Sequence, residues 1–224
     1  MNTTQNSRSE RIYNELRMDI LSGKISGGTR LAESTLANEK QVSRTPVREA
    51  LHQLVKEDLL YAIPRAGYVV QELTEQDIMD LFETRESIEL VAGLTALKRI
   101  SDEELTLLKN NLDRTQEVID SGITKGMIDL DIEFHDTIYK ATRSKYLYRI
   151  CLTLSEYTLK FRRSVIIVPE IAKRARRDHF NIYNALKTKD AIKVEEAIKF
   201  HLKVVKKDIL GHMTKLRQDS FLLR

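Results

Sequence analysis

The stretch from Val42 to Leu60, VSRTPVREALHQLVKEDLL, limits what the chain can fold into more than any other segment. Ser43 is a favourable helix N-cap, and Pro46 falls in the first turn, where its missing N–H costs no hydrogen bond. Apolar residues then recur at the three-and-four spacing of a helix, at Val47, Leu51, Leu54, Val55 and Leu59. The pattern predicts an amphipathic helix with one buried face.

A second face of the same helix is cationic. Arg44, Arg48 and His52 are spaced four residues apart, starting at the amino end of the helix. Side chains of this kind reach phosphate oxygens and guanine edges when a helix lies in the major groove. The alternative is an ordinary amphipathic helix with solvated arginines, and the neighbouring segments favour the first interpretation.

The segment before this helix predicts two further helices. Residues Ile12, Leu16 and Ile20 form the buried stripe of the first, and a glycine-rich loop separates it from a short helix over residues 33–40. Helix, short turn and helix is the arrangement that lays a second helix into the major groove.

The segment after the helix predicts a β-hairpin. Two β-prone runs, Tyr61–Ile63 and Tyr68–Val70, flank a turn rich in Pro and Gly, with Arg65 at its tip. Three helices and a hairpin form a winged helix, and the arginine on the wing is placed to touch the DNA backbone or the minor groove.

The order of these residues closely resembles the DNA-binding domain of GntR-type bacterial repressors. The resemblance rests on Gly23-x-Ile25-x-x-Gly28-x-x-Leu31, on SRTPVREAL at residues 43–51, and on Gly67. It implies DNA contacts from the recognition helix and the wing, by Arg44, Thr45, Arg48, Arg65 and Gly67, and we add the neighbouring His52. The sequence departs from the family at Gln41, where a turn glycine is usual, and at Ser34, where some members have a DNA-contacting arginine.

Composition gives the broad class. With 224 residues, 42% of them hydrophobic, the chain can form one large domain or two small ones, and its charge of +4 means that any cationic surface must be local. The single Cys151 excludes an internal disulfide framework and fits a reducing compartment. We expect a cytoplasmic protein, because no apolar run approaches the roughly 18 residues of a membrane span and the first residues lack a signal-peptide pattern.

Beyond residue 71 the sequence shows only helical periodicity. Thr74 and the capping-box pattern Ser101–Glu104 each open a helix, and further helices are expected over residues 127–142, 145–165, 169–187 and 190–216. We therefore expect a mainly α protein. A winged helix-turn-helix domain would cover residues 1–71, a linker 72–76, and an all-α bundle of about six helices 77–224.

Polar residues on the apolar faces of three of these helices carry the chemistry. Asp131 and His135 lie four residues apart on one helix, and His179 and His201 lie on the apolar faces of two later helices. A single buried histidine is usually a core residue with a hydrogen-bond partner, but burying all four groups unpaired would cost several kcal/mol. One divalent ion could satisfy all four, and three imidazoles with one carboxylate suit Zn²⁺, Ni²⁺, Mn²⁺ or Fe²⁺.

The same four residues resemble the motif of the FCD effector domain in the FadR branch of GntR regulators. That motif is Asp-x-x-x-His on one bundle helix and single histidines on two later ones, and it implies a metal site that commonly helps to hold a small carboxylate effector. By the resemblance, Arg85 matches a recurrent arginine of the first bundle helix and could pair with the effector carboxylate. The alternative for Arg85 is a helix-surface salt bridge with Glu89.

The sequence thus predicts a DNA-binding transcriptional regulator, a repressor and not an enzyme. We expect it to act as a homodimer on a pseudo-palindromic operator and to respond to a small organic acid or sugar acid. Two alternatives stay open. One is a metal-dependent enzyme acting on a small carboxylate, although the chain has no His-Glu-x-x-His pair and no obvious second inward acid. The other is a winged-helix adaptor with a purely structural metal site, which would bind DNA without sequence preference.

Overall fold

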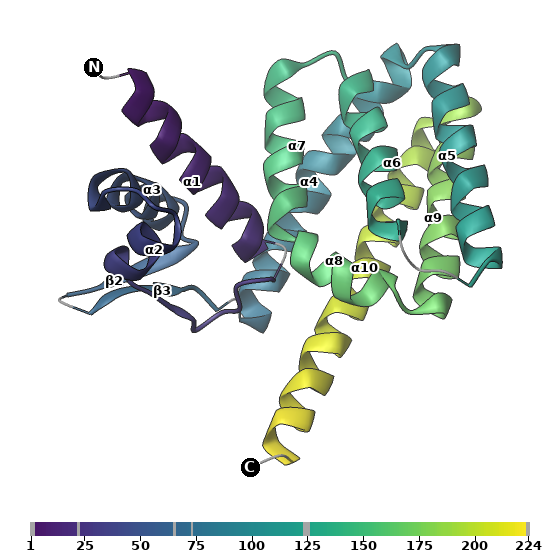
Figure 1. The fold of residues 1–224 in the computed structure, drawn as a ribbon. Helices are drawn as coiled ribbons and strands as arrows, with labels where there is room; N and C mark the ends of the chain where they lie inside the picture. The colour runs from purple at the N-terminus through teal and green to yellow at the C-terminus, as the bar shows by residue number, and fades with distance from the viewer. Residues whose placement is uncertain (1–2, 22, 65, 73, 123–125, 223–224) are drawn as a thin grey trace. The chain divides into compact units, whose positions relative to one another are not determined.

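The computed structural model describes residues 3–21, 23–64, 66–72, 74–122 and 126–222 (Figure 1). Its internal contacts divide the chain into two units, Met1–Thr74 and Glu75–Arg224.

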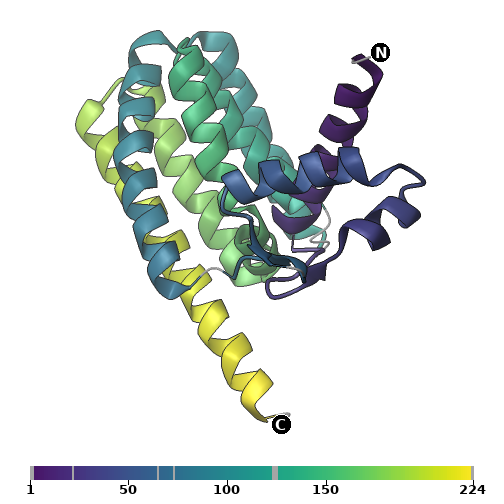
Figure 2. The same cartoon turned by 90° about the vertical axis from the view of Figure 1, so that its left-hand side faces the viewer.

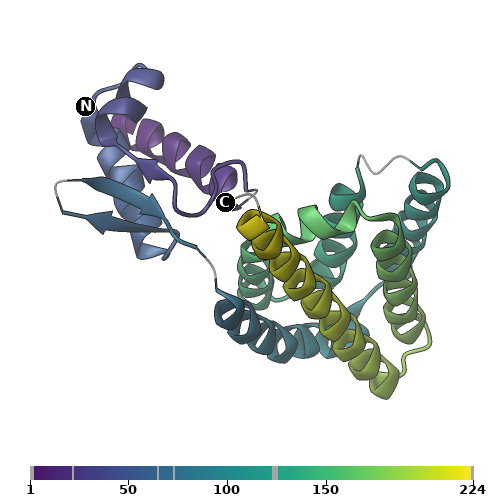
Figure 3. The same cartoon turned by 90° about the horizontal axis from the view of Figure 1, so that it is seen from below.

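The amino-terminal unit combines three helices with a small antiparallel sheet. In chain order its elements are α1 Thr3–Leu21, β1 Arg30–Leu31, α2 Glu33–Glu39, α3 Arg44–Lys56, β2 Leu60–Ile63 and β3 Gly67–Val70. Strand β3 lies in the middle of the sheet and pairs with both β1 and β2 (Figure 3). The winged helix-turn-helix fold is confirmed, with one strand more than the expected hairpin, since two residues of β1 are too few to show an alternating pattern.

The predicted apolar stripes form the core of this unit. α1 packs along α3, and six residues of these stripes are at most 3% exposed: Ile12, Leu16, Ile20, Val47, Leu51 and Leu54. The rest of the predicted α3 stripe differs, since Val55 is only half-buried and Leu59 lies beyond the end of α3 at Lys56. Ser43 stands at the N-cap of α3, but its hydroxyl accepts no capping hydrogen bond. In the turn before α3, Gln41 has a φ of 51°, so a left-handed conformation exists where the family usually has glycine.

Over its described residues, the carboxy-terminal unit is a bundle of seven helices (Figures 1 and 2). They are α4 Glu75–Arg99, α5 Asp102–Asp120, α6 Met127–Ala141, α7 Lys145–Tyr157, α8 Leu159–Ile166, α9 Pro169–Lys187 and α10 Ala191–Leu222. α10 packs against α4 and α9, and its carboxyl-terminal turns extend beyond the other helices of the bundle (Figure 2). The capping box of Ser101 and Glu104 is present at the start of α5.

The bundle has one helix more than expected because the segment 145–165 is not a single helix. It is divided at Thr158 into α7 and α8. The Thr158 hydroxyl donates to the carbonyl of Ser155 and accepts from Arg85. A threonine hydroxyl that bonds a carbonyl of the preceding turn competes with the helical backbone and bends the chain. Among the described residues, no helix has both the length and the apolar character needed to cross a membrane.

Candidate metal centre and nucleic-acid interface

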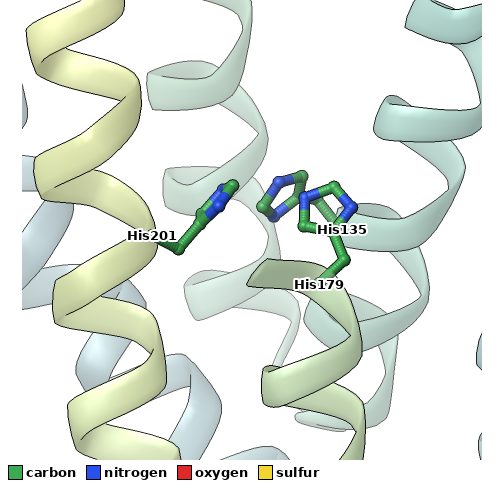
Figure 4. Close-up of side chains that lie close together, drawn as sticks. All are labelled: His135, His179 and His201. Carbon is green, nitrogen blue, oxygen red and sulfur yellow. The ribbon is translucent and has the colours of Figure 1, made fainter. Parts of the chain in front are cut away.

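Three histidines from three helices meet inside the bundle (Figure 4). His135 of α6, His179 of α9 and His201 of α10 are each at most 4% exposed. Their potential ligand atoms lie within 4.8 Å of one another, and the ring centroids are 4.8 to 5.3 Å apart. Each helix carries its histidine in its apolar stripe, so packing of the stripes brings the rings to one point.

Asp131 lies at the edge of this cluster, one turn before His135 on α6. Its Oδ1 atom is 3.7 Å from Nε2 of His179 and 4.0 Å from Nε2 of His135, and the residue is 7% exposed. The structure therefore brings together all four residues that the sequence predicted as metal ligands.

Burial keeps the three imidazoles uncharged. Loss of solvent is the main cause of a pKa well below the usual value for His135 and His201, and it lowers the pKa of His179 to about 4. Uncharged imidazole is the form that binds a metal ion.

The donor set fits a divalent cation. Several of its buried atoms have no hydrogen-bond partner in the described structure, namely Asp131 Oδ2, His179 Nε2 and His201 Nδ1. Uncharged nitrogen donors beside one carboxylate oxygen are the ligands expected for Zn²⁺ or a similar ion, and a bound cation would satisfy groups whose burial is otherwise costly. The cluster His135, His179 and His201 could thus hold a metal ion, with Asp131 next to it.

A cavity borders the cluster, and two buried arginines line it together with Asp131 and His201. Arg85 of α4 is 1% exposed; its Nη2 atom is 2.7 Å from Glu89 Oε1, and its Nη1 donates to Thr158 Oγ1 at 3.2 Å. The pair with Glu89 exists, but a position at the helix surface was wrong. Both residues lie on the face of α4 that packs inward, where the two buried charges compensate each other.

The second arginine, Arg162 of α8, was missed by the sequence analysis. It is 4% exposed, and its Nη1 atom lies 3.3 Å from Asp131 Oδ2 without an aligned hydrogen bond. The available signal was its spacing, three residues after Leu159 and three before Val165, which places it on an apolar face. The sequence analysis expected one continuous helix over residues 145–165 and assigned no inward face to it.

A buried acid in the same cavity was missed as well. Asp178 of α9 is 1% exposed and lines the cavity, so a second inward acid exists where none was obvious from the sequence. The available signal was its position three residues after Ala175 and four before Ile182, on the apolar face of α9. Its burial raises the pKa of the carboxyl group.

The predicted DNA-contacting residues of α3 are exposed in the amino-terminal unit: Arg44, Thr45, Arg48 and His52. Arg48 is bound by Glu33 of α2, and the His52 ring lies with its centroid 6.1 Å from that of Tyr68. Arg65 lies outside the described residues.

Gly67 opens β3 with a φ of +93°. A Cβ atom there would come within 2.7 Å of the carbonyl oxygen of Leu31. Only glycine therefore fits where β3 starts beside β1, and the residue has a structural reason in addition to any contact with DNA.

Two family comparisons bear on this arrangement. The family described as bacterial regulatory proteins, gntR family, matches residues 8–70, and the FCD domain matches residues 80–204. The chain belongs to the GntR family. It is a GntR regulator with an FCD domain as its second part, as the residues of both units had indicated.

Individual relatives of this GntR-family chain are also regulators. It is 33% identical over 193 residues to the gluconate operon transcriptional repressor of Bacillus licheniformis, covering 82% of this chain and 77% of that protein. It is 29% identical over 191 residues to the HTH-type transcriptional regulator YdhC of Bacillus subtilis, covering 85% and 84%. These relatives are transcriptional regulators and not enzymes, which removes the enzyme alternative.

Solved structures share the fold. The Escherichia coli protein McbR/YncC superposes with a TM-score of 0.72 at 22% identity, over 95% of this chain and 98% of that one. A GntR regulator from Rhodococcus sp. RHA1 superposes with a TM-score of 0.73 at 24% identity, over 92% and 98%.

Proposed function

We propose that this GntR-family regulator is a repressor that binds a pseudo-palindromic operator as a homodimer, and that a small carboxylate held beside a divalent ion in the bundle controls its operator affinity. The observation that carries the proposal is the cluster of His135, His179 and His201 beside a cavity lined by two buried arginines.

The amino-terminal unit supplies the DNA contacts. Arg44, Thr45 and Arg48 are exposed in the first half of α3, where a recognition helix meets base edges and phosphates. His52 lies one turn further along, and the wing adds Arg65 and the backbone at Gly67. In a dimer, two such helices reach half-sites about one helical turn of DNA apart.

The bundle supplies the sensor. Asp131, His135, His179 and His201 would hold the ion, with Zn²⁺, Ni²⁺, Mn²⁺ and Fe²⁺ as candidates. A bound ion provides a positive anchor for a carboxylate oxygen. Arg162, whose three guanidinium nitrogens have no hydrogen-bond partner in the described structure, lines the same cavity as Arg85, and both can bind the same carboxylate.

The size of the cavity suggests how the signal arises. Its free volume of about 20 Å³ holds no more than a water molecule or an ion. An organic acid can enter only if the surrounding helices move apart, so it binds one conformation of the bundle better than another, which is the condition for a ligand to shift a population. α4 carries Arg85 and begins at Glu75, directly after the amino-terminal unit, so its movement can alter the placement of the DNA-binding unit.

The test uses the full-length protein. Operator fragments would be isolated by binding to genomic DNA, and affinity measured by fluorescence anisotropy with and without Zn²⁺ and a panel of sugar acids and hydroxy acids. We expect sequence-specific binding to the operator, and we expect at least one acid to weaken this binding at least tenfold when Zn²⁺ is present. Sequence-specific binding that is unchanged by every metal and acid would contradict the proposed effector control and leave the DNA-binding part of the proposal standing. Purely salt-sensitive binding to any sequence would instead favour the adaptor alternative.

A further inference from the structure

The cavity beside the histidine cluster comes nearest to solvent between α9 and α10. Among its lining residues, Ile171 of α9 and Val204, Val205 and Asp208 of α10 are only half-buried, whereas the others are buried. Because the free volume of the cavity is about 20 Å³, nothing larger than a water molecule or an ion fits without movement. The side with the half-buried residues is therefore where the cavity can open with the least displacement of packed side chains.

An ion pair joins the two helices at this place. Nη2 of Arg174 on α9 lies 2.5 Å from both carboxylate oxygens of Asp208 on α10. Arg174 follows Ile171 by three residues, which is one turn of α9. Asp208 follows Val204 by four residues, which is one turn of α10. The pair therefore connects the two helices across the side of the cavity that lies closest to solvent.

The surroundings of this pair allow it to open reversibly. The side chain of Arg174 is 35% exposed and that of Asp208 is 15% exposed, so water and salt reach both groups. A partly exposed ion pair contributes little net free energy, because water replaces its bonds when the charges separate. By contrast, the side chains of Arg85 and Glu89, which pair on the inner side of the cavity, are 1% and 6% exposed. The outer pair is thus the one that can separate at low cost.

We propose that the pair of Arg174 and Asp208 is a reversible latch over the entrance of the cavity, and that the divalent ion and the ligand pass between α9 and α10 when the pair opens. His201 lines the same cavity and lies one turn before Val204 on α10, so this entrance leads directly to the histidine cluster. The inference rests on the proposed function and adds the route by which its site is filled.

Exchange of Zn²⁺ by the full-length protein tests the latch. Stopped-flow mixing of the metal-free protein with Zn²⁺ and a fluorescent zinc indicator gives the rate of uptake, and mixing of the Zn²⁺-loaded protein with excess EDTA gives the rate of release. In Asp208→Asn and in Arg174→Gln, we expect both rates to rise at least about threefold. The Kd for Zn²⁺ should stay within about twofold of the wild type, because the free and the loaded protein open more easily alike.

The direction of the two effects separates a latch from a simple change in charge. Removing a carboxylate weakens the attraction of a cation and removing a guanidinium group strengthens it, so electrostatics alone would change the rate of uptake in opposite directions in the two variants. A latch instead gives faster uptake and faster release in both. In the double variant Arg174→Asp with Asp208→Arg the pair can form again, and both rates should return toward those of the wild type.

The control variant is Glu195→Gln, which removes another carboxylate of α10 that pairs at 2.5 Å, with Lys199 of the same helix, and it should leave both rates unchanged. Unchanged rates in both latch variants would overturn the inference and leave the proposed metal site standing. Rates that change in opposite directions, or faster release with a matching loss of affinity, would overturn it as well. If the double variant does not fold, the single variants decide. No binding of Zn²⁺ by the wild type would count against both proposals.

Discussion

Glu33 of α2 holds the guanidinium group of Arg48 of α3 through both of its carboxylate oxygens, at 2.9 Å from Nε to Oε1 and 2.8 Å from Nη2 to Oε2. Tyr68 of β3 donates a further hydrogen bond to Glu33 Oε1 at 3.3 Å, and the bond from Arg48 is the main cause of a lowered pKa for Glu33. Glu33 thus connects α2, the recognition helix α3 and strand β3 at Arg48, the residue that we expect to contact the DNA bases.

This clamp predicts that Glu33 contributes to sequence discrimination. In Glu33→Gln, Arg48 loses its charged partner and a negative charge near the DNA disappears, so affinity for random DNA should rise. We expect the ratio of operator to random-DNA affinity to fall about three- to tenfold, measured by anisotropy at fixed salt. The control is Glu39→Gln, at the exposed end of the same helix. An unchanged ratio in Glu33→Gln would show that the clamp has no role in recognition.

Arg48 itself gives a second prediction. Arg48→Ala should weaken operator binding about ten- to hundredfold if its side chain contacts a base, and should leave metal content unchanged. Competition with random DNA distinguishes a contact to a base from a contact to a phosphate. An equal loss on both kinds of DNA would assign Arg48 to a phosphate instead.

The metal centre gives a third prediction. His179→Ala should lower metal occupancy and the thermal midpoint of the metal-loaded protein together, because binding to the folded state stabilises it by about 2.7 kcal/mol at a hundredfold excess over Kd. Elemental analysis and differential scanning fluorimetry would measure both quantities. His52→Ala, at an exposed histidine of the other unit, is the matched control. Full metal occupancy in His179→Ala would remove this residue from the site.

The low pKa values of the buried histidines predict the pH dependence of the metal-free protein. Unfolded histidine titrates near 6.5, whereas burial holds the pKa of His179 at about 4 in the folded state. Between these values the unfolded chain binds a proton that the folded protein excludes. Stability is therefore complete above pH 6.5 and should fall as the pH drops toward 4, by up to about 1.4 kcal/mol per pH unit for each histidine.

Urea unfolding at pH 7 and pH 5 would measure this loss. Carboxylates also titrate toward the lower pH, so the informative quantity is the difference between the wild type and His179→Gln. The variant should lose less stability over this interval. Equal losses would mean that His179 does not resist protonation in the folded state.

Local patterns in the sequence were sufficient for much of the fold and for the residues that gather in the bundle. The stripe of α3 and the capping box of Ser101 and Glu104 each lie within one short segment, so the local sequence reveals them. The convergence of Asp131, His135, His179 and His201 was predictable for the same reason, since each residue lies in the apolar stripe of its own helix and stripes meet in a core.

What the sequence did not reveal depends on contacts between elements. The break at Thr158 involves a hydrogen bond from Arg85, 73 residues earlier in the chain. The sequence predicted one helix over residues 145–165 without an inward face, and Arg162 was assigned no role. Strand β1 is defined by its pairing with β3, and Asp178 lines its cavity together with residues of α8 and α10 that lie far from it in the sequence.

The Arg85 side chain takes part in two features of the bundle. It donates a hydrogen bond to Thr158, at the break between α7 and α8, and it also lines the cavity. A bound carboxylate that drew this guanidinium group away from Thr158 would remove the hydrogen bond between α7 and α8 in the same step. Ligand binding in the cavity and movement of α8 relative to α7 would then occur in a single step, without a separate chain of contacts to couple them.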